Sequence, residues 1–195
     1  MHDIARIQMR VLRCLLILRV ERFIFPPPCL TPFILFVANI HAATPLTLVA
    51  KVERISDDDT VTAITSNHIK LRIRLLGIDA PEVSHGGRAG QPFGEEARDY
   101  LDHLIGGKTV RVDAYVPDKY KRVLAVIWDG QVNVNLSMVA MGYAEVYRGA
   151  VCQAYCRELE APEVNTRRDW VGMWVQGVRY EIPGMFRRRT WIQGV

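Results

Sequence analysis

The sequence predicts an α+β domain that is mainly β: a five-stranded Greek-key barrel with about three helices, preceded by a hydrophobic leader. Three observations support this. Segments that alternate apolar and polar residues, rich in β-branched side chains, recur between residues 46 and 128. Stretches with helical spacing are few and come after the third such segment. The 195 residues, 49% hydrophobic, suffice for one domain with its own core plus a leader or tail.

The leader, residues 1–43, differs in composition from the rest of the chain. A basic start leads into apolar stretches interrupted by prolines, and its last eleven residues, 33–43, are predominantly apolar and end in small residues. A signal-peptide hydrophobic region needs about 7–15 residues, whereas a membrane-spanning helix needs about 20. We therefore expect a signal peptide and an exported protein, periplasmic or extracellular. A retained membrane anchor and a true start at Met9 are the alternatives.

Net charge and cysteine content limit the function only weakly. The net charge is +4, but the leader carries +3 of it and residues 44–195 only +1, so bulk charge identifies no partner. Two cysteines fall in the domain, Cys152 and Cys156, and no His or third Cys lies near enough in sequence to suggest zinc. A disulfide between them fits an exported protein, provided the chain leaves regular helix there.

Five segments are predicted to be strands. Tight turns at residues 56–59 and 66–67 join the first three into a β-meander, because short Asp, Ser and Asn side chains bond their own backbone. The polar turn 117–121 separates the last two strands, and Asp129-Gly130 ends the fifth. The five segments are residues 46–55, 60–65, 69–76, 109–115 and 122–128.

Three segments are predicted to be helices. Residues 95–105 place apolar side chains on one face and stop at a Gly-Gly pair. Residues 135–141 end at a glycine, and residues 162–170 begin with Pro162, which suits a first helical turn. Five strands with helices in this order indicate an OB-type barrel, a fold that commonly binds oligonucleotides on one face. The domain is expected to span residues 44–180, with 181–195 as a basic, solvated C-terminal tail.

Acidic and basic side chains gather where the predicted strands begin or end. Asp59 lies in the first turn, Arg74, Asp79 and Glu82 surround the end of the third strand, and Arg122 opens the fifth. Each alone also suits a solvated turn or an exposed strand. Phosphodiester hydrolysis needs a carboxylate to activate water, and cationic groups to neutralise the phosphoryl oxygens. A calcium ion needs oxygen ligands. Together these five side chains supply each role.

The segments resemble the staphylococcal nuclease (thermonuclease) family from about Leu48 to Trp174. The resemblance rests on three motifs: Asp-Thr-Val at 59–61, Arg-x4-Asp-x-Pro-Glu at 74–82 and Asp-Lys-Tyr-x-Arg at 118–122. Segments 138–147 and 172–174 also resemble the family. The combination is specific, and it covers nearly all of the expected domain.

The resemblance implies a role for each matching residue. Asp59, Asp79 and the backbone carbonyl of Ala80 would bind Ca²⁺. Glu82 would act on the attacking water, and Arg74 and Arg122 would hold the scissile phosphate.

Further positions match the pattern or depart from it. Lys119 and Tyr120 would contact a terminal phosphate, and Tyr147 a nucleotide. Ala80 stands where the family usually has Thr, and Asp58 and Lys121 stand where it has Gly. We expect these departures to alter affinity more than chemistry.

The activity implied by the resemblance is that of a monomeric, Ca²⁺-dependent endonuclease. This phosphodiesterase would cut DNA and RNA, preferring single strands, and leave 3′-phosphate ends. A non-catalytic nucleic-acid-binding OB module is the alternative, and a membrane-tethered interaction protein is a third. The complete catalytic set favours the enzyme.

Overall fold

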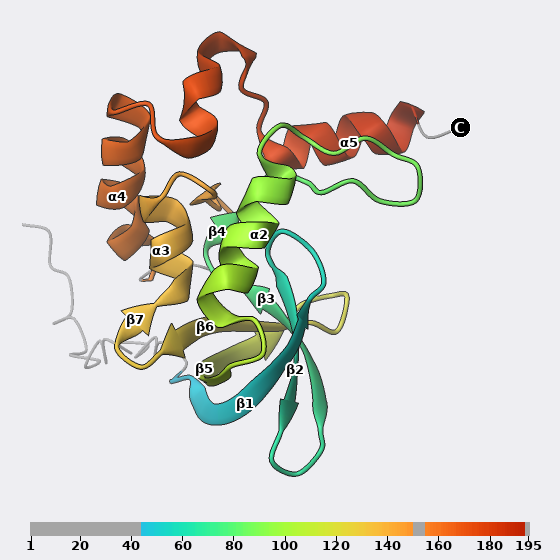
Figure 1. Cartoon of the computed structure of the whole chain (residues 1–195), viewed down its shortest axis with the longest axis vertical. Coiled ribbons are helices and arrows are strands. Elements are labelled where there is room, and N and C mark those ends of the chain that lie inside the picture. The colour runs from blue at the N-terminus through green and yellow to red at the C-terminus, as the bar shows by residue number, and fades with distance from the viewer. Residues whose placement is uncertain (1–43, 150–154, 194–195) are drawn as a thin grey trace, which may run out of the picture. The chain divides into compact units, whose positions relative to one another are not determined.

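The computed structural model describes residues 44–149 and 155–193 (Figure 1). The predicted leader, 1–43, lies outside the described residues, as does Cys152, so the signal peptide and the disulfide stay predictions. Within the two described ranges, no helix combines the length and apolar character needed to cross a bilayer.

The predicted five-stranded barrel is confirmed. Four neighbouring strand pairs, β1–β2, β2–β3, β1–β5 and β5–β6, are antiparallel. Parallel pairing of β3 with β6, with Ile73 opposite Val123, closes the ring. The strands are β1 (Leu46–Ile55), β2 (Thr60–Thr65), β3 (Lys70–Leu75), β5 (Thr109–Pro117) and β6 (Val123–Asp129).

The core lies inside this barrel, because alternate strand residues point inward. Val52, Val61, Ile73, Val112 and Ile127 are each at most 1% exposed. Three two-residue strands complete the β-structure: β4 (Ile78–Asp79) pairs with β8 (Glu145–Val146), and β7 (Val132–Asn133) extends the main sheet beside β6.

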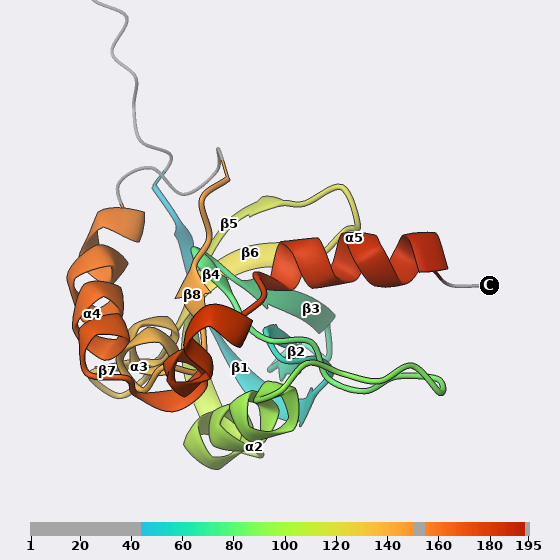
Figure 2. The ribbon, with the colours of Figure 1, turned by 90° about the horizontal axis from the view of Figure 1, so that it is seen from above.

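Helices cover part of the barrel (Figures 1 and 2). Helix α2 packs against β1, α3 against β6, and α4 against α3. The helical segments are α2 (Gly94–Ile105), α3 (Val134–Ala140), α4 (Cys156–Arg168), a 3₁₀ segment η1 (Gly172–Arg179) and α5 (Pro183–Gln193).

The predicted start of the third helix is wrong. Helix α4 begins at Cys156, so Pro162 lies inside the helix and not in its first turn. An interior proline costs about 3 kcal/mol, since it removes a backbone hydrogen bond. Here Leu159, Glu163 and Thr166 form one buried face, and the packing of that face outweighs the cost.

The C-terminal segment also differs from expectation. Residues 183–193, expected as part of a solvated tail, form α5. Apolar and charged residues are spread evenly around this helix, which therefore has no apolar face. The sequence consequently lacks the hydrophobic periodicity that would predict a helix here.

Candidate active site

The first carboxylate of the site is positioned by the turn from β1 into β2. Thr60 lies opposite Arg74 in the β2–β3 ladder, and the backbone N–H of Leu75 donates to the carbonyl of Asp59 at 3.0 Å. This register places the Asp59 carboxylate beside the guanidinium of Arg74, with Oδ2 2.5 Å from Nη1. Both side chains are buried, so the ion pair forms away from bulk water.

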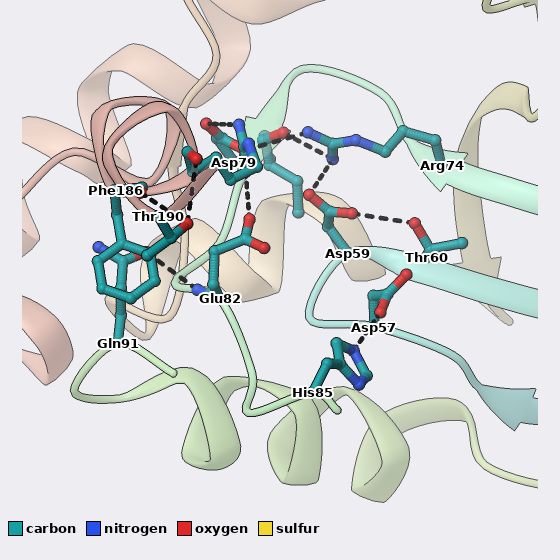
Figure 3. A network of polar contacts seen from close by, with 12 residues as sticks. Asp57, Asp59, Thr60, Arg74, Asp79, Glu82, His85, Gln91, Phe186 and Thr190 are labelled. Atoms are coloured by element: carbon teal, nitrogen blue, oxygen red, sulfur yellow. Dashed lines mark hydrogen bonds and ion pairs between the residues drawn. The ribbon is translucent and has the colours of Figure 1, made fainter. Parts of the chain in front are cut away.

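The second carboxylate comes from β4. Gly77 has φ of 81°, a left-handed conformation that favours glycine, and it turns the chain from β3 into β4. Asp79 then pairs with Glu145 across the β4–β8 ladder. Its Oδ1 accepts a hydrogen bond from Nη2 of Arg74 at 3.2 Å, while Nη1 of Arg74 donates to the Ile78 carbonyl at 3.0 Å. A single arginine therefore joins Asp59 to Asp79, as Figure 3 shows.

Glu82 is held by the loop that leads into α2. Its backbone N–H donates to Oε1 of Gln91 at 3.0 Å, and its carbonyl accepts from the Gln91 backbone N–H at 2.8 Å. Gly94 packs so closely that a Cβ there would lie 2.2 Å from the Glu82 carbonyl oxygen. These contacts fix the backbone of Glu82, whose half-buried carboxylate lies on the same side of the barrel as Asp79 (Figure 3).

Arg122 is oriented by the turn between β5 and β6. Asp118 accepts hydrogen bonds from the backbone N–H of Tyr120, at 2.8 Å, and from both the backbone and Nε of Arg122, at 2.9 Å each. Nη1 of Arg122 donates to the hydroxyl of Thr60 at 3.1 Å, and that hydroxyl donates to Asp59 at 3.1 Å. Arg122 is therefore connected to Asp59 through Thr60.

The two positions where a side chain replaces the family's Gly differ in their consequences. Asp58 does not adopt a positive φ and is only 3% exposed, so its side chain is accommodated without that strain. Lys121 has φ of 61°, in the left-handed region where L side chains are disfavoured by about 1–2 kcal/mol. The lysine at this position is therefore strained.

Substituting Lys121→Gly is expected to raise the free energy of unfolding by about 0.5–1 kcal/mol, because relief of the strain exceeds the entropy cost of glycine. Urea denaturation measures the change. Lys119→Gly, in the same turn but without a positive φ, is the control, and it should not stabilise the protein. Equal stabilisation by both substitutions would contradict the strain argument.

The predicted substrate contacts lie at the edges of the site. Nζ of Lys119 lies 4.9 Å and the Arg122 guanidinium 5.5 Å from the Tyr120 ring centre, and Tyr120 is 62% exposed. Tyr147 is 43% exposed and lies directly after β8, where its N–H donates to the Gly77 carbonyl at 2.9 Å. Ala80 is buried directly after Asp79. Tyr147 therefore lies next to β4, whereas Lys119 and Tyr120 lie in the same turn as Arg122.

Sequence reasoning missed Arg187. From α5, its Nη2 lies 3.0 and 2.9 Å from the two carboxylate oxygens of Asp79, and its Nη1 donates to Glu82. In the sequence it is the first of three consecutive arginines, and nothing local distinguishes it from the other two. Only the prediction of a helix here would have shown that the three arginine side chains point in different directions.

Burial sets the electrostatics of the site. Burial raises the pKa of Asp58 well above its usual range, and the charges of Asp59 and Glu82 add to the effect. Burial also raises the pKa of Asp59, against the opposing charge of Arg74, and that of Glu82, against its hydrogen bond to Arg187. The ionised forms of these clustered acidic groups are therefore disfavoured unless cations lie nearby.

The donor set suits a hard cation. Asp59 and Asp79 supply carboxylate oxygens and Ala80 a backbone carbonyl, which are ligands that Ca²⁺ prefers. In residues 44–149 and 155–193, no three acidic, His or Cys side chains are grouped as a ready metal cage. Arg74 and Arg187 bind the carboxylate oxygens instead.

Comparison with known proteins agrees with this geometry. Residues 72–176 match the family described as staphylococcal nuclease homologue. The chain is 38% identical over 128 residues to a probable endonuclease LCL3 of Candida tropicalis, covering 60% of this chain and 53% of that protein. It is 39% identical over 129 residues to the protein of the same name from Clavispora lusitaniae, covering 61% and 54%. The match to that of Leptosphaeria maculans is 38% over 130 residues, covering 63% and 42%.

The chain spans about half the length of the two yeast relatives. The matched region contains most of β3, all of β4, the Glu82 loop and the Arg122 turn, and so holds most of the site. Because the family model covers more than half of the chain, this protein belongs to the staphylococcal nuclease homologue family.

Proposed function

We propose that this protein is a Ca²⁺-dependent endonuclease that hydrolyses phosphodiester bonds in DNA and RNA. One observation carries the proposal: a continuous series of polar contacts joins Arg122 to Thr60 and, through Asp59 and Arg74, to Asp79. Figure 3 shows the part from Thr60 to Asp79. Groups from three separate turns are thereby brought to one end of the barrel. Family membership and the relatives named as probable endonucleases support the same activity.

Each side chain of the site has its own role in the proposed hydrolysis. Glu82 accepts a proton from water as the water oxygen forms a bond to phosphorus. Arg74 and Arg122 donate to the phosphoryl oxygens, whose negative charge grows in the transition state. The bond from phosphorus to the 5′ oxygen breaks, and that oxygen takes up a proton. The products are a 3′-phosphate and a 5′-hydroxyl end.

Asp59, Asp79 and the Ala80 carbonyl would hold the calcium ion. When bound, Ca²⁺ supplies positive charge that stabilises the phosphoryl oxygens in the transition state. The two buried aspartates share the guanidinium of Arg74, and ionised carboxylates are costly away from water unless positive charge lies near them, so their position favours such a cation.

The surroundings of the site favour a single-stranded substrate. Tyr120 and Tyr147 are exposed aromatic residues, and bases can stack on aromatic rings only when they are not stacked in a duplex. Lys119, exposed beside Tyr120, would bind a terminal phosphate. We further propose that the protein acts as a monomer and is exported through the leader, with membrane retention by that segment as the alternative.

The test is cleavage of a defined single-stranded oligonucleotide by the full-length protein, in millimolar Ca²⁺ or in excess chelator. We expect cleavage only with Ca²⁺, and 3′-phosphate ends by mass spectrometry. Asp79→Asn should abolish cleavage at this Ca²⁺ concentration, because it removes a ligand charge. Binding of the oligonucleotide without cleavage under every condition would instead establish the non-catalytic OB module.

A further inference from the structure

Arg187 lies among the groups that the proposed function requires to be free. Its Nη2 is within 3.0 Å of both oxygens of Asp79, the residue assigned to the cation, and its Nη1 donates to Glu82, the residue assigned to water. Phe186 and Thr190 lie on the same helix as Arg187, and the Thr190 hydroxyl donates to the Phe186 carbonyl at 3.0 Å (Figure 3).

The chain leading into α5 is fastened to the barrel. The Tyr180 hydroxyl donates to Glu145 at 2.8 Å, and the Tyr180 ring lies 4.7 Å from that of Trp174. The side-chain amide of Gln91 donates to the Glu181 carbonyl at 2.9 Å, while its oxygen accepts from the N–H of Glu82. These contacts position α5 next to the candidate active site.

The helix itself is held less firmly than its approach. It has no apolar face, and Met185 on it is 58% exposed. Of the neighbouring arginines, Arg189 pairs with Glu181 at 2.8 Å, within the same segment, and Arg188 is exposed. Arg187 alone of the three reaches the carboxylates, so it provides the main charged link between α5 and the site.

A guanidinium and a calcium ion cannot share these oxygens favourably. The Asp79 oxygens already accept hydrogen bonds from the positively charged guanidinium of Arg187. A divalent cation placed beside that guanidinium would be strongly repelled. Without either cation, Asp79 would keep Arg74 as its partner but retain uncompensated charge together with Glu82. Arg187 therefore keeps the metal-free site paired.

We propose that Arg187 is an intramolecular competitor of the cation: it occupies the Asp79–Glu82 position in the metal-free protein, and α5 releases it when a divalent cation binds. This inference rests on the proposed function, because it needs the cation to bind Asp79. It makes the C-terminal helix an autoinhibitory element whose release frees Glu82 at the same time. Calcium affinity then reports the cost of displacing Arg187.

The first test is calorimetric titration of Ca²⁺ into the full-length protein and into Arg187→Gln. Loss of the competitor should tighten Ca²⁺ binding about 10- to 100-fold, the scale of a hydrogen bond between charged groups. Arg188→Gln is the matched control, since it removes the same charge from the next residue of the helix, which is exposed. It should bind Ca²⁺ like the wild type. Asp79→Asn identifies the heat that belongs to this site.

The second test is amide hydrogen exchange of residues 184–193, the part of α5 whose backbone carries N–H groups. In the wild type, Ca²⁺ should accelerate exchange along α5, whereas Arg187→Gln should exchange fast even without Ca²⁺. Both results together support the competitor.

Three outcomes would contradict the proposal. Equal or weaker Ca²⁺ binding by Arg187→Gln, with binding still lost in Asp79→Asn, would overturn the competitor and leave the cation site standing. Exchange of α5 that ignores both Ca²⁺ and the substitution would also overturn it. Absence of Ca²⁺ binding in every variant, Arg187→Gln included, would overturn the proposed cation site itself and the competitor with it.

Discussion

Replacing Glu82 with Gln is expected to lower kcat on single-stranded DNA by about 10²–10⁴, the contribution typical of a general base. The amide has nearly the same shape, but it cannot accept the proton of the attacking water. The loop should remain in place, because the backbone of Glu82, and not its side chain, makes both hydrogen bonds to Gln91. Steady-state rates in saturating Ca²⁺ measure the effect.

Glu96→Gln is the matched control for this change. It makes the same substitution on the exposed face of α2 and should leave kcat unchanged. Oligonucleotide affinity, measured separately, should change little in Glu82→Gln, since the residue acts on water. A Glu82→Gln protein that retains wild-type kcat would remove Glu82 from the chemistry.

Replacing Arg122 with Ala is expected to lower kcat by about 10²–10³, the loss seen when one preorganised transition-state donor is removed. The guanidinium is held by Asp118 on one side and by the Thr60 hydroxyl on the other, so its position is set before substrate arrives. Burial acts against it, but hydrogen bonds from Arg122 and Tyr120 lower the pKa of Asp118, which keeps that carboxylate charged and able to orient Arg122.

Arg72→Ala provides the comparison, because Arg72 is an exposed arginine on β3. It should affect kcat little. Arg122→Lys adds a second measurement: it keeps the charge but lacks the planar fork of donors, so it should recover only part of the lost rate. Full activity in Arg122→Lys would indicate that charge alone matters, and full activity in Arg122→Ala would refute the assignment.

Much of the fold was predictable because its signals are local. The alternation of side chains in β1, β2 and β5 reflects the two-residue period of a strand, and Asp, Ser and Gly mark their turns. The helix at Pro162 shows where a local rule fails. Pro162 favours a first turn by itself, yet the burial of Leu159 and Glu163 extends α4 past it.

The site was only partly predictable for the same reason. Its residues stand in short motifs near strand ends, and their chemical types indicate phosphodiester chemistry. Their spatial relations are not local: Arg74 binds Asp59 only because β2 and β3 pair in one register, and Arg122 reaches Thr60 across 62 positions of the chain. The strain at Lys121 likewise depends on a backbone angle that the residue type does not reveal.

The sequence by itself determined the strand pattern, the OB-type barrel and the identity of the acidic and basic groups at its end, because periodicity and turn chemistry act over a few residues. Only the tertiary structure decided that α5 returns to this end and that Arg187, of three consecutive arginines, binds Asp79 and Glu82. The physical reason is that a charged helix without an apolar face carries no periodic signal. Its position comes from the contacts of Tyr180 and of the Glu181 carbonyl just before it, and from ion pairs of Arg187 to carboxylates more than 100 residues away in the chain.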